Sequence, residues 1–499
     1  MFTPKKPQPS IFFTFLFIAC LLFCGIATAT PSITLLRKSG PPTSRILVSG
    51  SGFKPNVGVD IFFDTKDEVL VVTNGKGEFD KANIHAPRNA RPGKHWVTAL
   101  ERNNDKGAQE PFLVQTDWSQ LGFAFQHDGL NRYENVLNPE TVSSMTLKWA
   151  FPTSIVYSAP AISGGVVYIG SQDNNVYALD AATGVRLWSY TTGDWVTTSP
   201  AVEKGVVYVA SRDGVLYALD RRTGAKVWSY NLGGSMWCSP VVADGLVYAG
   251  STSGTLYAFN AQSGTVTWSQ GVNGEVDASP TLANGVVYVG SSDYNLYAFN
   301  ARSGTQLWKC NTGYYANLSF AVSNGVLYGS SLASGLVALN ASTGALLWSY
   351  DEFGIGTAPA VAYGLVYFGS LDTSALYALD ANTGAKVWSS VERGEANTPA
   401  VANGVVYFGT YAGDFYALDA HTGALLWSYA SSNEVSSPLG VTNGVAYFSD
   451  GSGVYAFGLP RGDEAKQDAA SKRPDLKTLH PDFNLKMSLP VTTLSDVER

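Results

Sequence analysis

The sequence predicts an all-β protein in which a small β-sandwich precedes an eight-bladed β-propeller. Three observations support this fold. A unit such as residues 199–230, SPAVEKGVVYVASRDGVLYALDRRTGAKVWSY, recurs with a period of about 40 residues. Each copy divides into four short strand-like segments separated by Gly, Asn, Asp and Ser. No segment has a helical period of useful length, which favours blades of four antiparallel strands over a helical solenoid.

The start of each copy is marked by a proline or, in the fifth copy, by a phenylalanine. The second segment, such as GVVYIGS at 165–171, is almost entirely apolar, as is typical of a strand buried on both faces between neighbouring sheets. The eight markers are Pro160, Pro200, Pro240, Pro280, Phe320, Pro359, Pro399 and Pro438.

Each copy ends in a turn that places a tryptophan. In ALDAATGVRLW, residues 178–188, Asp180 can bond the backbone ahead of it, and Gly184 can take a positive φ, so that Trp188 arrives at a fixed place. We expect one indole to fill the wedge between each pair of neighbouring blades. The predicted docking residues are Trp149, Trp188, Trp228, Trp268, Trp308, Trp348, Trp388 and Trp427.

Trp149 lies upstream of the first full copy, whereas the last copy stops at residue 458 before its fourth strand. We therefore expect the strand at 147–151 to complete the last blade. Such closure removes the free sheet edges that an open array would expose.

The motif A-x-D-x-x-x-G-x-x-x-W resembles the repeat of pyrroloquinoline quinone (PQQ)-type propellers, a family that includes quinoprotein dehydrogenases and BamB-like outer-membrane assembly proteins. The resemblance covers residues 115 to 458. It implies an eight-bladed ring and two classes of function, a PQQ- and calcium-dependent dehydrogenase or an assembly scaffold.

The N-terminal residues 1–29 are predicted to be a secretory signal peptide. Lys5 and Lys6 precede an apolar run at 11–26 and the small residues 27–29. A retained membrane anchor is the alternative, although the run is short for a spanning helix. We therefore expect a secreted, periplasmic or cell-surface protein without a membrane span after cleavage.

The charge of the chain argues against nucleic acid as a partner. The net charge of −7 becomes −9 without residues 1–29, because these contain two lysines and no acidic residue. No basic stripe is present.

Residues 31–115 are predicted to form the sandwich. Alternating segments such as RILVSGSGF and KHWVTALER resemble a bacterial immunoglobulin (Ig)-like module. A spacer role is favoured over adhesion. A solvated acidic loop is favoured over a calcium site for the nearby acidic residues, because their spacing does not match a calcium loop. These residues are Asp60, Asp64, Asp67 and Glu68.

The remaining boundaries are a connector at 116–143, the propeller at 144–458 and a C-terminal tail at 459–499. The connector is expected to pack against the ring, and its His127 is not expected to be catalytic. The tail is rich in charge and poor in aromatic residues, which predicts disorder.

A candidate binding site precedes the innermost strands, where side chains from all copies should converge on one face. Its aromatic, carboxylate and amide groups could hold a flat ligand or a cation, although a hydrated funnel without any ligand is the favoured interpretation. The candidate ligand-binding residues are Trp195, Trp237, Glu275, Asp277, Asn317, Glu395, Asn397 and Glu434, with Tyr315 and Asn433 beside them.

The sequence thus favours a monomeric, non-catalytic scaffold that binds other proteins of the envelope or cell exterior. No catalytic residue, metal site or cofactor is assigned. A PQQ- and calcium-dependent dehydrogenase of alcohols or sugars is one alternative, and the two cysteines that would remain, Cys238 and Cys310, are not the adjacent pair that such enzymes commonly have. Cell-surface adhesion through the sandwich is the other alternative.

Overall fold

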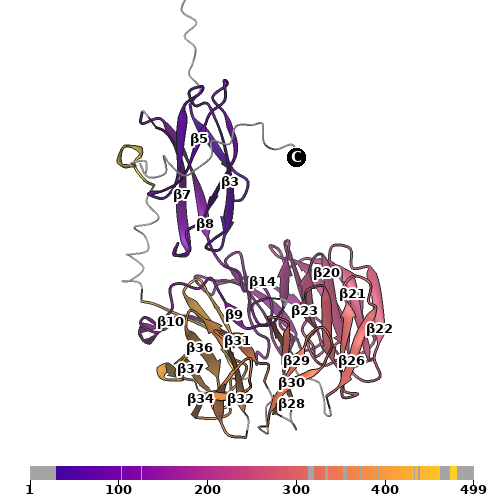
Figure 1. The fold of residues 1–499 in the computed structure, drawn as a ribbon. Coiled ribbons are helices and arrows are strands. Elements are labelled where there is room, and N and C mark those ends of the chain that lie inside the picture. The colour runs from indigo at the N-terminus through magenta and orange to yellow at the C-terminus, as the bar shows by residue number, and fades with distance from the viewer. Residues whose placement is uncertain are drawn as a thin grey trace, which may run out of the picture.

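The computed structural model describes residues 30–102, 104–124, 126–312, 320–331, 335–351, 357–370, 372–391, 393–431, 433–435, 439–460 and 473–479. These residues form a small sandwich that stands on a wide ring of sheets (Figure 1). Two short 3-10 turns, η1 (Val142–Ser144) and η2 (Leu476–Thr478), are the helical elements of the described part. The prediction of an all-β chain is therefore confirmed.

The expected signal peptide lies outside the described residues. In the described part, we find no helix with the length and apolar character needed to cross a membrane.

The sandwich consists of a three-stranded sheet, β1-β3-β6, and a five-stranded sheet, β2-β8-β7-β4-β5. Its core is apolar and includes Ile46, Ile61 and Phe112, all fully buried. The strands are β1 (Ser32–Leu35), β2 (Ser39–Gly40), β3 (Arg45–Ser51), β4 (Gly58–Phe63), β5 (Lys66–Val72), β6 (Phe79–His85), β7 (Gly93–Glu101) and β8 (Gly107–Val114).

The acidic residues of the sandwich are not all in a solvated loop. Asp60 is 1% exposed on β4, and both of its carboxylate oxygens accept hydrogen bonds from Arg102, at 2.6 and 2.9 Å. Asp64 pairs with His95. The prediction of a solvated acidic loop is therefore wrong for these two residues, because each has a cationic or hydrogen-bonding partner brought to it by strand pairing.

The ring consists of sheets of four antiparallel strands, one of which gains a fifth strand, β9 (Leu130–Asn131). Each sheet except the last runs in chain order from an innermost strand of three residues to an outermost strand. The first sheet is β11 (Ala161–Ser163), β12 (Val166–Gly170), β13 (Asn175–Asp180) and β14 (Arg186–Thr191). The following six are β15 (Ala201–Glu203), β16 (Val206–Ala210), β17 (Val215–Asp220) and β18 (Lys226–Asn231); β19 (Val241–Ala243), β20 (Leu246–Ser251), β21 (Thr255–Asn260) and β22 (Val266–Gly271); β23 (Thr281–Ala283), β24 (Val286–Gly290), β25 (Asn295–Asn300) and β26 (Gln306–Asn311); β27 (Ala321–Ser323), β28 (Val326–Ser331), β29 (Gly335–Asn340) and β30 (Leu346–Tyr350); β31 (Ala360–Ala362), β32 (Leu365–Ser370), β33 (Ala375–Asp380) and β34 (Lys386–Val391); and β35 (Ala400–Ala402), β36 (Val405–Gly409), β37 (Asp414–Asp419) and β38 (Leu425–Ala430).

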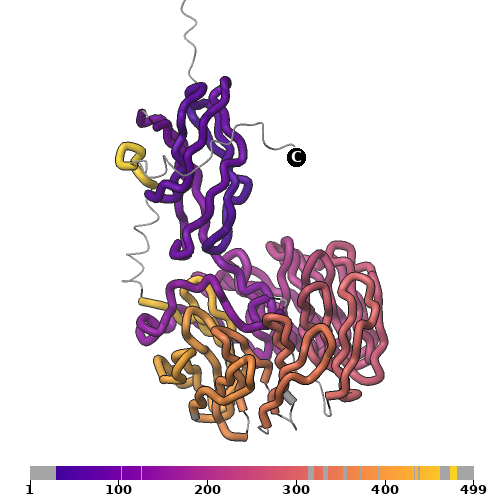
Figure 2. The backbone as a smooth tube through the Cα atoms, in the orientation of Figure 1, coloured from indigo at the N-terminus to yellow at the C-terminus, as the bar shows by residue number. Residues whose placement is uncertain are grey.

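The last sheet joins the two ends of the ring. It contains β39 (Gly440–Thr442), β40 (Val445–Asp450), β41 (Gly453–Gly458) and, as its outermost strand, β10 (Thr146–Pro152) from the start of the ring. β10 pairs antiparallel with β41, and Trp149 faces Ala456. The pairing is the one expected from the position of Trp149, and Figure 2 shows the purple start of the ring beside its yellow end.

The tryptophans of the outermost strands hold neighbouring sheets together. Each indole N–H donates to a backbone carbonyl at 2.9 to 3.2 Å. In seven cases this carbonyl belongs to the next sheet and lies in the turn after its third strand, which is β13 in the first sheet. Trp427 completes the circle by donating to Met145, which directly precedes β10. The donor and acceptor pairs are Trp149 and Ala181, Trp188 and Arg221, Trp228 and Ala261, Trp268 and Ala301, Trp308 and Ala341, Trp348 and Ala381, Trp388 and Ala420, and Trp427 and Met145.

The glycine of each turn is required by this docking. Gly304, for example, has a φ of +71°, and a Cβ atom there would lie 2.6 Å from the indole of Trp268. The turn itself is fixed by the Asn or Asp before it. Asn300 accepts bonds from the backbone of Arg302 and Ser303.

The outermost strands are also bulged. In the first sheet the register shifts so that Leu187 has no partner between Trp188 and Arg186, and the same shift recurs in the six following sheets. A bulge bends an edge strand away from flat pairing. The exposed rim of the ring is therefore protected against edge-to-edge association.

The C-terminal tail is partly ordered, so the prediction of disorder from 459 to 499 is wrong for residues 473–479. Leu479 is 5% exposed and forms a small apolar cluster with Phe62 and Leu100 of the sandwich. The carbonyl of Pro474 accepts a bond from Gln109, at 2.9 Å. Two leucines three residues apart thus give the tail an apolar contact that its overall composition conceals.

Candidate functional site

The predicted site lies in the loops that enter the innermost strands, and we call this region the mouth. A recurring backbone bond fixes these loops. A residue one or two positions after the second strand of a sheet donates its N–H to the carbonyl of the loop residue, at 2.9 to 3.1 Å. The donor and acceptor pairs are Gln172 and Ile155, Arg212 and Trp195, Thr252 and Ser235, Ser292 and Glu275, Tyr411 and Glu395, and Gly451 and Glu434.

Because the same bond defines them, Trp195, Glu275, Glu395 and Glu434 occupy equivalent positions and lie at the same face of the ring. Asn317 and Tyr315 lie outside the described residues. Asn433 is exposed beside Glu434.

One side of the mouth is aromatic and cationic. The guanidinium carbon of Arg212 lies 3.6 Å from the ring centroid of Trp237 and 4.9 Å from that of Trp195. The indoles are 50% and 41% exposed, respectively. Partial burial lowers the pKa of Arg212, and Asp194 and Tyr157 oppose that effect. The result is a fixed cation between two half-exposed aromatic rings.

The adjoining part of the mouth is acidic. Burial raises the pKa of Asp277 to about 6, and the neighbouring carboxylate of Glu275 adds to the rise. The Oδ1 atom of Asp277 is buried and has no hydrogen-bond partner among the residues that the structure describes. A carboxyl group in this state is able to exchange a proton near neutral pH.

A second acidic part surrounds Tyr411, which is 39% exposed. Burial raises the pKa of Tyr411, and Glu434, Glu395 and Tyr157 add to it through their charges. Tyr157 acts on both Arg212 and Tyr411. The cationic and acidic parts of the mouth are therefore close enough to influence one shared neighbour.

Asn397 is not part of the open surface. It is 6% exposed, and its amide donates to the carbonyl of Val435 in the next loop at 3.3 Å. Its position therefore fits a structural link between two neighbouring sheets.

Cys238 is likewise structural. It is fully buried, and its thiol donates to the carbonyl of Gly250 at 3.3 Å. Burial raises the pKa of the Cys238 thiol to about 12, with a smaller contribution from Asp277. Cys238 is therefore a thiol at neutral pH, without nucleophilic character.

The opposite end of the innermost strands is covered by the connector, which the sequence predicted only to pack against the ring. The described residues of 116–131, which we call the inner segment, cross the inner edges of the sheets and accept hydrogen bonds from their free backbone N–H groups, at 2.6 to 3.1 Å. The donor and acceptor pairs are Ile162 and Trp118, Val202 and Ser119, Val242 and Gln120, Val322 and Gln126, Val361 and Asp128, and Val401 and Gly129.

The two remaining sheets are also contacted. The hydroxyl of Thr281 lies 3.2 Å from Nδ1 of His127, and the hydroxyl of Thr442 donates to the carbonyl of Thr116 at 2.8 Å. Unpaired inner N–H groups would be costly if buried, so the inner segment stabilises the ring while it closes one end. The mouth is left as the accessible end of the innermost strands.

His127 belongs to this closed end. Burial lowers its pKa to about 4, so the imidazole is neutral under ordinary conditions. The hydroxyl of Thr281 donates to the carbonyl of Phe320 at 2.7 Å. It therefore accepts from Nδ1 of His127, and the buried Nε2 atom has no partner in the described part of the chain. A structural role fits this environment better than acid–base chemistry.

Among the described residues, no group of three His, Cys, Asp or Glu side chains is placed to hold a metal ion. Cys238, in the loop before β19, and Cys310, on β26, are free thiols.

The ring of four-stranded sheets, closed by β10 and docked through one tryptophan per sheet, defines a β-propeller of the PQQ type. A family model described as outer membrane protein assembly factor BamB matches residues 136–236, 212–319, 312–400 and 372–465. Together these matches cover more than half of the chain. The chain therefore belongs to this family of PQQ-type repeat proteins.

Solved structures with the same fold include both enzymes and an assembly protein. BamB from Moraxella catarrhalis has 20% identity and a TM-score of 0.56, covering 63% of this chain and 100% of that chain. Quinohemoprotein alcohol dehydrogenase from Comamonas testosteroni has 17% identity and a TM-score of 0.61, with coverage of 69% and 82%. A europium-containing methanol dehydrogenase has 15% identity and a TM-score of 0.60, with coverage of 69% and 98%.

At these identities the likeness concerns the fold and does not choose between the two classes of function. The search of curated proteins gives no significant match.

Proposed function

We propose that this chain is a non-catalytic binding and assembly scaffold of the cell envelope or cell exterior. In this proposal an eight-bladed propeller binds other proteins through its mouth, and an Ig-like sandwich serves as a spacer. The observation that carries the proposal is the arrangement of Trp195, Arg212 and Trp237. The two indoles are half-exposed, and the guanidinium of Arg212 lies against both. Trp and Arg are among the residue types that contribute most of the binding energy at protein interfaces.

The closed end of the ring supports the same assignment. Because the inner segment occupies the inner edges, a partner reaches the innermost loops from the mouth side. The backbone bonds that fix these loops also reduce the ordering cost of binding.

The charge of the ring indicates what kind of partner fits. Residues 116–458 carry 24 acidic and 12 basic side chains. A partner with a basic surface would be steered toward the ring, with an aromatic or acidic contact at Arg212. Its association rate should fall as the salt concentration rises.

The proposal is tested by placing a photo-crosslinking amino acid at position 195 in the full chain, in the cells that produce it. The matched control carries the same amino acid at position 347, where Leu347 is 51% exposed on the outer rim. A defined crosslinked protein from position 195 and none from position 347 would support the scaffold. Equal patterns from both positions would contradict it.

A dehydrogenase remains the second candidate because of Asp277, whose pKa of about 6 would suit a general base. Calorimetric titration of the purified chain with PQQ, with and without calcium, tests this candidate. Saturable binding that requires calcium would favour the enzyme, and absence of both heat and thermal shift would leave the scaffold.

A further inference from the structure

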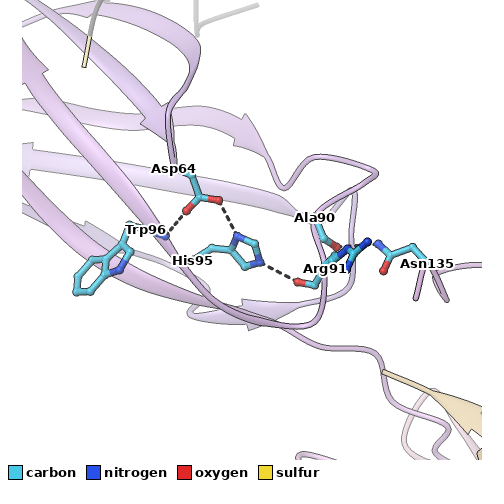
Figure 3. A network of polar contacts seen from close by, with 6 residues as sticks. All are labelled: Asp64, Ala90, Arg91, His95, Trp96 and Asn135. Carbon is cyan, nitrogen blue, oxygen red and sulfur yellow. Dashed lines mark hydrogen bonds and ion pairs between the residues drawn. The ribbon is translucent and has the colours of Figure 1, made fainter. Parts of the chain in front are cut away.

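The junction between the sandwich and the ring contains a buried histidine with two acceptors. His95 on β7 is 4% exposed. Its Nδ1 lies 2.7 Å from a carboxylate oxygen of Asp64, and its Nε2 lies 2.7 Å from the carbonyl oxygen of Arg91 (Figure 3). A carboxylate and a carbonyl only accept, so both ring nitrogens must donate. A neutral imidazole has one N–H, and both bonds together therefore require the imidazolium.

The surroundings of His95 leave Asp64 as its charged neighbour in the described part. Arg91 contributes a backbone carbonyl, and the ring of Phe63 lies 5.2 Å away. Phe112 on β8 is opposite in the strand pairing and fully buried. Burial alone would lower the pKa of His95, but the bonds to Asp64 and Arg91 and the charge of Asp64 outweigh it and raise the pKa above its usual value.

Asp64 cannot easily follow a change at His95. Its other carboxylate oxygen accepts from the backbone N–H of Trp96 at 3.0 Å, and its own N–H donates to the carbonyl of Trp96 at 2.7 Å. When the imidazole of His95 loses a proton, the remaining N–H donates to the carboxylate of Asp64, because a charge-assisted bond is the stronger one. Two lone pairs then face each other between Nε2 and the Arg91 carbonyl.

The loop that carries this carbonyl also makes the contact with the ring. The neighbouring peptide presents the carbonyl of Ala90, which accepts from the side-chain amide of Asn135 in the connector at 2.8 Å (Figure 3). Pro87 and Pro92 flank the loop and restrict its backbone. A displacement at Arg91 is therefore transmitted to the Ala90 contact.

Asn135 is itself tied to the ring through the preceding residue. The buried carboxylate of Glu134 accepts from the backbone of Gly444 in the last sheet at 3.0 Å. The chain connection makes a further contact of this junction, where Thr116 and Asn443 exchange two bonds of 2.8 Å and the hydroxyl of Thr442 also donates to the carbonyl of Thr116. The Asn135–Ala90 bond thus restrains rotation about the Thr116 connection.

We propose that protonation of His95 locks the sandwich onto the ring and that its loss releases the lock. With the imidazolium present, the 87–92 loop is held, and Asn135 bonds to it. With the neutral imidazole, the 87–92 loop moves away from His95 because the bond to the Arg91 carbonyl is lost. The sandwich then turns about Thr116. This inference is independent of the proposed partner binding.

The test measures the distance between spin labels on the full chain at pH 5.5 to 9. The labels are placed at Lys76→Cys in the sandwich and Arg222→Cys on the ring, both exposed, in a chain that also carries Cys310→Ser. One narrow distribution is expected at low pH. It should broaden as the pH passes the pKa of His95, which an NMR titration of the same chain measures.

The variants separate the lock from general effects of pH. His95→Gln should lose the pH response, whereas His85→Gln, an exposed histidine on β6, should retain it. Asn135→Ala leaves the sandwich core intact and should give the broad distribution at every pH while His95 still titrates. An unchanged distribution across the titration of His95, or a pH response that survives in Asn135→Ala, would overturn the proposal.

Discussion

The docking of one tryptophan between neighbouring sheets makes a quantitative prediction for Trp268. This side chain is 8% exposed, its N–H donates to Ala301 at 2.9 Å, and its ring lies against Gly304. Removing a buried Trp by Trp268→Ala should lower the free energy of unfolding by about 3 to 5 kcal/mol. Trp268→Phe should cost about 1 to 2 kcal/mol, because the Ala301 carbonyl keeps a second donor, the hydroxyl of Tyr248 at 3.0 Å.

Urea unfolding followed by fluorescence and circular dichroism measures these differences. Trp195→Ala is the matched control, since its indole is 41% exposed at the mouth. We expect it to change the free energy of unfolding by less than about 0.5 kcal/mol. If Trp268→Ala cost no more than Trp195→Ala, the docked indoles would not be what holds neighbouring sheets together.

Three further changes test other parts of the structure. Gly304→Ala should cost about 1 to 3 kcal/mol more than Gly285→Ala, as compared by urea midpoints, because both have positive φ but only the first meets an indole. The pKa of Asp277 is raised to about 6, which means that the folded state binds its proton more tightly than the unfolded state does. The free energy of unfolding should therefore fall by about 1 kcal/mol as the pH rises from 4 to 6, after allowance for solvent screening. Asp277→Asn should remove this fall. The lowered pKa of His127, about 4, has the opposite sign: the unfolded chain takes up the proton first, and stability should fall by about 3 kcal/mol as the pH drops from 6.5 to 4. An unaltered acid denaturation profile in His127→Gln would contradict that assignment.

The parts of the fold that repeat could be predicted from the sequence. The spacing of Asp180, Gly184 and Trp188 encodes a turn, a close contact and a docked ring, and each is repeated with the same chemistry. The position of Trp149 upstream of the first full copy also indicated that β10 pairs with β41 to close the ring. Repetition made these signals readable because each copy solves the same packing problem.

The non-repeating parts carried no comparable signal. The inner segment accepts hydrogen bonds mostly through backbone carbonyls, which any residue provides, so Ser119 or Gly129 could not be recognised from its side chain. The contact of Leu479 with the sandwich depends on two leucines within a charged tail.

The mouth was predicted in part. Arg212 was missed because it follows the second strand and joins Trp195 and Trp237 only in the folded ring. Asn397 has the composition of a surface group, but a shorter loop turns its amide onto Val435. Loop length therefore decides which side chains of this region face outward.

In the proposed scaffold, Trp195 and Trp237 of the mouth bind the protein partner. The most direct test is the affinity of the crosslinked partner for the wild-type chain, for Trp195→Ala/Trp237→Ala and for the rim control Leu347→Ala, measured at fixed salt. We expect a loss of affinity of at least about tenfold for the mouth variant and no change for the control. Equal affinities for all three chains would contradict it.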